Sequence, residues 1–274
     1  MYLTRDEILL ASGDAAEEAV AALDRLVSRH LVVAYPPDYR YRARHRVVAD
    51  LVVDKLRQLE QLPEVLVGLA FAAAAKVDRT QAPSHRSWRL LVRIINHEFL
   101  LKLVTVQQAR AVYEEIESIL SFDYHYWLQR GSLEVQAGDV RLADNFLSQV
   151  RSIRPDDYKI ETEYAYMLMR RAYEEPHRVD ARELIREGTQ ILEGVIANRG
   201  DIDPYAFHVL GAQGLSWIRR AALAPSEARE ALQKFLEVAK AGLRRHPDRP
   251  ELQQLVQDLQ KEYLMTVARR GPAQ

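Results

Sequence analysis

The sequence contains no cysteine among its 274 residues, which excludes disulfide bonds, thiol catalysis and thiolate metal sites. Glycine and proline are scarce, with 11 of each, so long helices are favoured over a turn-rich β fold. The longest apolar run, Val65–Ala75, is too short to span a bilayer and too far from the N-terminus to be a signal peptide. We therefore expect a cytoplasmic protein without membrane contact, in which this run forms a buried helix.

Charge of one sign and catalytic motifs are lacking as well. The formal net charge is −1, so any attraction to nucleic acid or an anionic membrane must be local. The sequence has no G-x-x-x-x-G-K-[ST] loop to hold a triphosphate and no G-x-S-x-G nucleophile motif. His97-Glu98 is followed by Leu at position 101, where a zinc-protease helix requires a second His. We expect no catalytic site, no metal site and no cofactor in this chain.

The first 60 residues predict two helices, a β-hairpin and a third helix. Thr4 and Glu7 form a capping-box pattern, which starts the first helix. The predicted ranges are 5–11, 14–29 and 46–59 for the helices, and 31–35 and 39–45 for the strands. Helix, helix, hairpin is the order of a winged-helix unit. The predicted core-facing residues are Ala19, Val20, Leu23, Leu26 and Val27 in the second helix, and Val48, Leu51, Val52 and Leu56 in the third.

From Pro63 onward the pattern is purely helical, and the predicted helices pair as antiparallel hairpins. Their ranges are 63–77, 84–103, 105–120, 123–137, 139–152, 157–174, 179–199, 204–223, 225–245 and 248–269.

One stretch resembles a tetratricopeptide repeat. Trp127 and Gly131 are four residues apart, Ala143 follows twelve residues later, and Pro155 twelve after that. This resemblance implies a helical hairpin in which the Trp lies between two closely crossing helices and the Pro ends the second one. The expected fold is therefore mainly α, with a winged-helix-like unit over 1–60 and a tetratricopeptide-like α-solenoid over 61–274.

The segment RARHRVVADLVVDKL, Arg42–Leu56, resembles the winged-helix region of STAND-type signal-transduction NTPases, a class that includes bacterial antiphage sensors. A winged helix followed by helical repeats is the order in that family. The resemblance implies the C-terminal sensor region of a larger protein, or a standalone relative, with an NTPase domain in cis or in trans and oligomerisation on activation. It also implies that His45, with Arg44 beside it, contacts the β-phosphate of ADP bound to that NTPase.

Arg40, Arg42, Arg44 and Arg46 occupy every second position of the predicted second strand and its end. On a strand this spacing places at least the first three on one face. Three interpretations remain open: contact with a nucleic-acid backbone, contact with the nucleotide or an acidic surface of an NTPase domain, or a solvated face paired with nearby acids.

The repeat register also predicts a ligand groove, because the first helix of each tetratricopeptide hairpin lines the concave face. The polar and aromatic positions in this register suit a protein or peptide ligand, although inter-repeat packing or solvation would explain them equally. They are His125, Ser132, Gln136, Lys159, Tyr166 and Arg170.

The sequence thus predicts a non-catalytic sensor or regulatory region that recognises a protein or peptide and controls a STAND-type NTPase, in bacterial antiphage defence. One alternative is a winged-helix DNA-binding regulator whose helical repeats receive a signal. A second is a plain protein-interaction scaffold.

Overall fold

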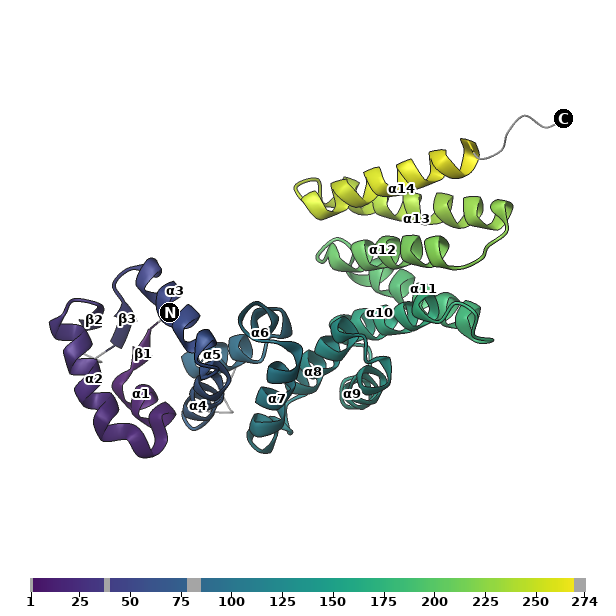
Figure 1. Ribbon diagram of the computed structural model, residues 1–274. Helices are drawn as coiled ribbons and strands as arrows, with labels where there is room; N and C mark the ends of the chain where they lie inside the picture. Colours follow the sequence, from purple (N-terminus) through teal and green to yellow (C-terminus); the bar gives the residue numbers. More distant parts are fainter. Residues whose placement is uncertain (1, 37–39, 78–84, 269–274) are drawn as a thin grey trace. The chain divides into compact units, whose positions relative to one another are not determined.

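The computed structural model describes residues 2–36, 40–77 and 85–268. These described residues are mainly helical, with 78% of them in helices and one small three-stranded sheet among them (Figure 1). The expected mainly α fold class is confirmed. Residues 37–39, 84 and 269, which belong to predicted elements, lie outside the described residues. No helix within the described ranges is both long enough and apolar enough to cross a bilayer.

The chain divides into two compact units, Met1–Leu133 and Glu134–Gln274, by its internal contacts. Helix α8 (Tyr124–Ala137) contains the boundary. The domain boundary expected near residue 60 stays a prediction.

The first unit begins with an antiparallel sheet of order β1-β3-β2, made of β1 (Leu3–Thr4), β2 (Val32–Tyr35) and β3 (Arg40–Ala43). The hairpin of β2 and β3 was predicted, although its register was not. In the structure Val33 lies opposite Arg42, and Tyr35 lies opposite Arg40. Strand β1 was not predicted, because two residues are too few to show the alternation that identifies a strand. Thr4 ends β1 and also caps the next helix, and its side chain accepts the backbone N–H of Glu7.

Helices make up the rest of the first unit, and α4 is central to it. It packs against α1, α5 and α7, and it buries Leu66, Ala70, Ala72 and Ala73. The helix predicted for the long apolar run is confirmed. The bounds are α1 (Arg5–Ser12), a 3-10 turn η1 (Gly13–Ala15), α2 (Ala16–Ser28), α3 (Arg46–Gln58), α4 (Leu62–Ala74), α5 (Arg86–Ile94), α6 (His97–Leu103) and α7 (Val106–Leu120).

Several expectations for this unit are wrong. The single helix predicted over 84–103 is two helices, because the Asn96 side chain accepts the backbone N–H of Phe99 and starts α6. The predicted inner face of α3 is not buried. No residue of α3 is buried, and the side chains of Leu51 and Val52 are 64% and 52% exposed. In α2 only Leu23 is buried. Periodicity shows that a helix has an apolar face, but it does not show that anything covers that face.

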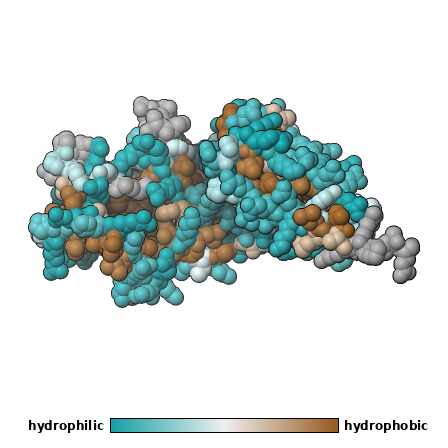
Figure 2. Space-filling view, turned by 90° about the horizontal axis from the view of Figure 1, so that it is seen from above, coloured by the Kyte–Doolittle hydropathy of each residue, from teal (hydrophilic) through white to brown (hydrophobic). Residues whose placement is uncertain are grey.

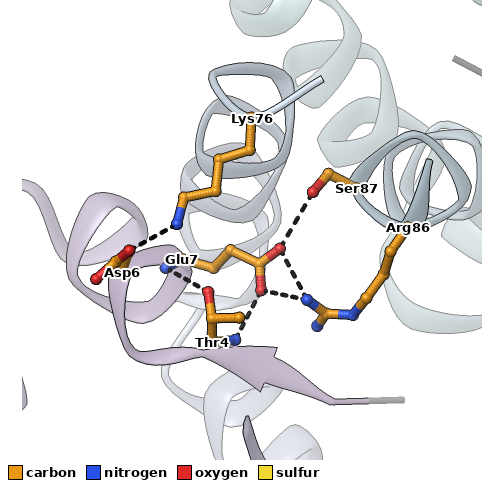
Figure 3. Close-up of polar contacts among 6 residues, drawn as sticks. All are labelled: Thr4, Asp6, Glu7, Lys76, Arg86 and Ser87. Atoms are coloured by element: carbon orange, nitrogen blue, oxygen red, sulfur yellow. Dashed lines mark hydrogen bonds and ion pairs between the residues drawn. The ribbon is translucent and has the colours of Figure 1, made fainter. Parts of the chain in front are cut away.

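A buried carboxylate connects α1 to the start of α5 (Figure 3). The side chain of Glu7 is 1% exposed; its Oε2 accepts the Thr4 backbone N–H at 2.7 Å and Arg86 Nη1 at 3.0 Å. Ser87 Oγ donates to the other oxygen at 3.3 Å. Beside this cluster, Asp6 pairs with Lys76 near the end of α4 at 3.0 Å, in a more exposed position. The Glu7 contacts fix the sheet and α1 to the helices that follow.

The second unit consists of helical hairpins. Helices α10 and α11 pack together, as do α12 and α13, while α12 also packs against both α10 and α14. Local signals start these helices: the Asp139 side chain accepts the Leu142 N–H, the Asp157 side chain accepts the Lys159 N–H, and Pro225 is the first residue of α13. The bounds are α9 (Val140–Ile153), α10 (Tyr158–Glu174), α11 (Ala181–Arg199), α12 (Tyr205–Arg220), α13 (Pro225–Arg245) and α14 (Pro250–Ala268).

Candidate functional site: the arginine segment and the helical hairpins

The arginine segment, Arg40–Arg46, runs along β3 and into the start of α3. Directly opposed residues of an antiparallel pair share a face, so Arg40 and Arg42 lie on the same side of the sheet as Tyr35 and Val33. Tyr41 and Ala43 point the other way and line an apolar cavity with α1 and α2. The predicted alternation is present for Arg40 and Arg42, which are both exposed, whereas Arg44 lies beyond the end of β3 and is not on the strand face.

Arg42 packs against two aromatic rings, which also contact each other edge to face. Its guanidinium carbon lies 5.4 Å from the ring centre of Tyr2 and 5.2 Å from that of Tyr35, and Nη1 donates to the Tyr2 hydroxyl at 3.3 Å. Such cation–π contacts stabilise a fixed orientation while leaving the positive charge in place. Arg42 is therefore a preorganised cation on an exposed sheet face.

Arg44, His45 and Arg46, at the end of the segment, are exposed. The Arg44 backbone N–H donates to the Leu31 carbonyl, which positions the chain at the end of β3. His45 occupies the N-cap position of α3 without a side-chain capping bond. Arg46 lies 3.5 Å from Asp50, but the two side chains are 92% and 64% exposed, so this pair contributes little. The segment can attract an anion through four guanidinium groups.

The groove residues predicted in the first unit are not both accessible. Ser132 is 2% exposed and lies in the interior. The His125 backbone N–H donates to Asp123 Oδ1 at 2.7 Å, its ring Nδ1 lies 3.2 Å from the same oxygen, and its ring packs on Tyr124. His125 is thus half-buried and held by its neighbours.

Three groove residues predicted in the second unit come together around one guanidinium. Arg170 donates through Nε to Glu174 at 2.6 Å and through Nη1 to the Gln136 backbone carbonyl at 3.3 Å. Burial raises the pKa of Tyr166, and the positive charge of Arg170, together with a hydrogen bond to it, partly offsets that effect. Arg170 is therefore already engaged within the chain, whereas the Gln136 side chain is exposed.

Lys159, the sixth predicted groove residue, is exposed near the start of α10. Its ammonium lies 5.8 Å from the ring centre of Tyr158, and the guanidinium of Arg199 lies 5.8 Å from the same ring. This Tyr158 ring is one wall of a cleft of about 570 Å³ between α10 and α11, which the sequence did not predict. We call it the α10–α11 cleft.

The first unit also has apolar side chains on its surface, which are visible in brown at the left of Figure 2. One cavity of about 370 Å³ lies between the inner face of the sheet, α1 and α2. Its lining residues are Leu3, Ile8, Ala19, Ala22, Leu23, Leu26, Val32, Tyr41, Arg42 and Ala43.

Among the described residues no group of three or more His, Asp or Glu side chains is arranged to hold a metal ion. No protein-family model matches the chain, and no curated protein and no solved structure matches it.

Proposed function

We propose that the chain is a non-catalytic recognition region in which tetratricopeptide-like hairpins bind a protein or peptide and a winged-helix-like unit transmits that binding to a STAND-type NTPase. The NTPase domain is in cis or in trans, the setting is the bacterial cytoplasm, and activation leads to oligomerisation. Binding controls the NTPase only if the ligand has different affinities for its two states.

The packing of α10 to α14 is the observation that carries this proposal. Each hairpin packs within itself, and α12 packs on both α10 and α14, which is the neighbour-on-neighbour arrangement of a solenoid. Repeats stacked in this way present extended surfaces that suit protein ligands. In the first unit, the order of α1, α2 and the β2–β3 hairpin supports a winged-helix-like unit.

Nucleotide retention tests the NTPase part of the proposal. The chain is added to the P-loop protein encoded in or beside its gene, and release of a fluorescent ADP analogue is followed. The wild-type chain should slow release, and His45→Ala or Arg44→Ala should remove the effect, because these residues stand where the family places its phosphate contact. Equal release with and without the chain, or the absence of any such NTPase gene, would contradict this part.

The arginine segment favours one alternative, a DNA-binding regulator. Exposed Arg40, Arg42 and Arg44 would neutralise phosphates, and each lost contact lowers the salt slope of binding by about one. Under this alternative, the triple substitution by Ala abolishes duplex binding at low salt. Titration of a fluorescent duplex between low and physiological salt decides the matter: a wild-type chain that does not bind at low salt removes the alternative.

A further inference from the structure

The α10–α11 cleft lies wholly within the second unit, away from the predicted groove residues Gln136, Tyr166 and Arg170. Its volume of about 570 Å³ is within the range of ligand sites in proteins. Its lining combines the start of α10 with one face of α11. The lining residues are Asp156, Tyr158, Glu161, Gln190, Ile191, Gly194, Val195, Asn198 and Arg199.

Gly194 is the informative residue of this lining. It lies inside the 19-residue helix α11, where glycine weakens a helix relative to alanine. A Cβ built on Gly194 meets nothing within 4 Å, so packing inside the chain does not require glycine there. Gly188 on the same helix differs, because its Cβ would lie 2.6 Å from Met169 Cγ. Close approach of another backbone is one situation that calls for glycine, and Gly194 leaves room for it.

Two side-chain amides flank Gly194 on the same face of α11. Gln190 precedes it by one turn and Asn198 follows it by one turn. Both side chains are exposed, and neither has a hydrogen-bond partner in the part of the chain that the structure describes. Each amide offers a donor and an acceptor, which together match the C=O and N–H of a peptide main chain.

The spacing of these amides fits an extended chain. Eight residues of helix rise about 12 Å, a length that three to four residues of extended peptide cover. The opposite wall is rigid: Glu161 is held by Arg151 through contacts of 2.6 and 2.9 Å, and Arg199 stacks on Tyr158. Asp156, at the mouth, has no ion pair among the described residues.

We propose that the α10–α11 cleft binds an extended peptide segment of three to four residues, whose main chain lies against Gly194 and is held by Gln190 and Asn198. Asp156 and Arg199 contribute one charge of each sign, so the bound segment is one without a strong net charge. Lys159 is the one predicted groove residue that contacts the lining, through the Tyr158 ring, and the proposal does not depend on the other groove residues.

Selection from a phage-displayed library of random dodecapeptides tests the proposal. The library is selected on the immobilised full chain, and enriched peptides are synthesised and titrated by fluorescence anisotropy. Gly194→Ala adds one carbon atom to the cleft, and Gly194→Leu adds four. The added Cβ meets no other atom of the chain within 4 Å. We expect Gly194→Leu to weaken binding by about tenfold or more, and Gly194→Ala and Asn198→Ala to weaken it less.

Two controls separate this site from a general effect. Ala197→Leu puts the same side chain on an exposed position of α11 outside the cleft and should leave affinity within about twofold. Gln136→Arg alters the predicted groove and should also have no effect. Thermal melting of each variant establishes that it is folded.

The outcomes are distinct. Failure to enrich any peptide, or an unchanged affinity in Gly194→Leu, overturns the cleft proposal. Peptides that lose affinity in Gln136→Arg but not in Gly194→Leu also overturn it and support the predicted groove instead. If the chain binds a saccharide on a glycan array and Gly194→Leu removes that binding, the cleft is a saccharide site and the peptide assignment is overturned.

Discussion

Replacing Glu7 by Gln tests whether one buried carboxylate fixes the first sheet and α1 to the helical part of the first unit. The glutamine keeps the size of the side chain but removes its charge. The side chain of Glu7 is 1% exposed and accepts hydrogen bonds from Thr4, Arg86 and Ser87 (Figure 3). Because the site is buried, water cannot take the place of the carboxylate as a partner for these donors.

The expected cost follows from burial. Breaking a buried ion pair by removing one partner costs about 3–5 kcal/mol, because the other charge is left without compensation. The Arg86 side chain is 33% exposed and can regain some hydration, so we expect about 2–3 kcal/mol. Asp6→Asn is the matched control: Asp6 and Lys76 lie 3.0 Å apart with side chains 75% and 29% exposed, and such pairs contribute about 0.2–1 kcal/mol.

Urea denaturation of the full chain measures both variants, and amide hydrogen exchange of the peptide covering α1 shows where protection is lost. Glu7→Gln should lower the denaturation midpoint more than Asp6→Asn and increase exchange in α1. In a double-mutant cycle, Arg86→Leu should be less harmful when Glu7 is already Gln. A cost for Glu7→Gln no larger than that of Asp6→Asn would refute the reasoning.

Two further predictions concern the second unit. Gly214→Ala should destabilise it by about 1–3 kcal/mol, since a Cβ there would lie 2.5 Å from the Phe235 ring; a thermal melt without a lowered midpoint would show that α12 and α13 adjust freely. Burial lowers the pKa of His208 below its ordinary value of about 6.5, with Glu251 opposing the effect. The unfolded state then binds more protons than the folded state below about pH 7, so stability is lost as pH falls from about 7 through 6.5 toward the folded-state pKa. His208→Gln should remove this loss in urea titrations at pH 7.5 and 5.5, and an unchanged difference between the two pH values would contradict the assignment.

Helix ends in the second unit were predictable because their signals are local. Asp139 and Asp157 cap α9 and α10 through bonds to residues two or three positions ahead, and Pro225 starts α13. Asn96 is the same kind of signal, and it was missed because the apolar pattern continues across it. A cap residue inside a periodic stretch can start a new helix even where the apolar pattern continues.

Contacts between distant residues were not predictable in the same way. The alternation of arginines predicted the correct face for Arg40 and Arg42. It did not predict that Arg42 contacts the rings of Tyr2 and Tyr35, because those contacts depend on how the strands pair. The repeat register gave Ser132 as a groove residue, whereas it is 2% exposed. The repeat register shows on which side of its helix a residue lies. Whether that side is exposed depends on the neighbouring helices.

Gly188 and Gly194 show how the structure adds to the sequence. Both interrupt the same helix, and a sequence pattern would treat them alike, as two sites where glycine costs about 0.5–1 kcal/mol relative to alanine. The structure separates them, because a Cβ would strike Met169 at Gly188 and would meet open space at Gly194. Alanine should therefore destabilise the fold at the first position and stabilise it at the second. A residue whose replacement improves the fold but weakens binding is retained for the ligand, and this opposite pair of effects distinguishes a recognition surface from ordinary packing.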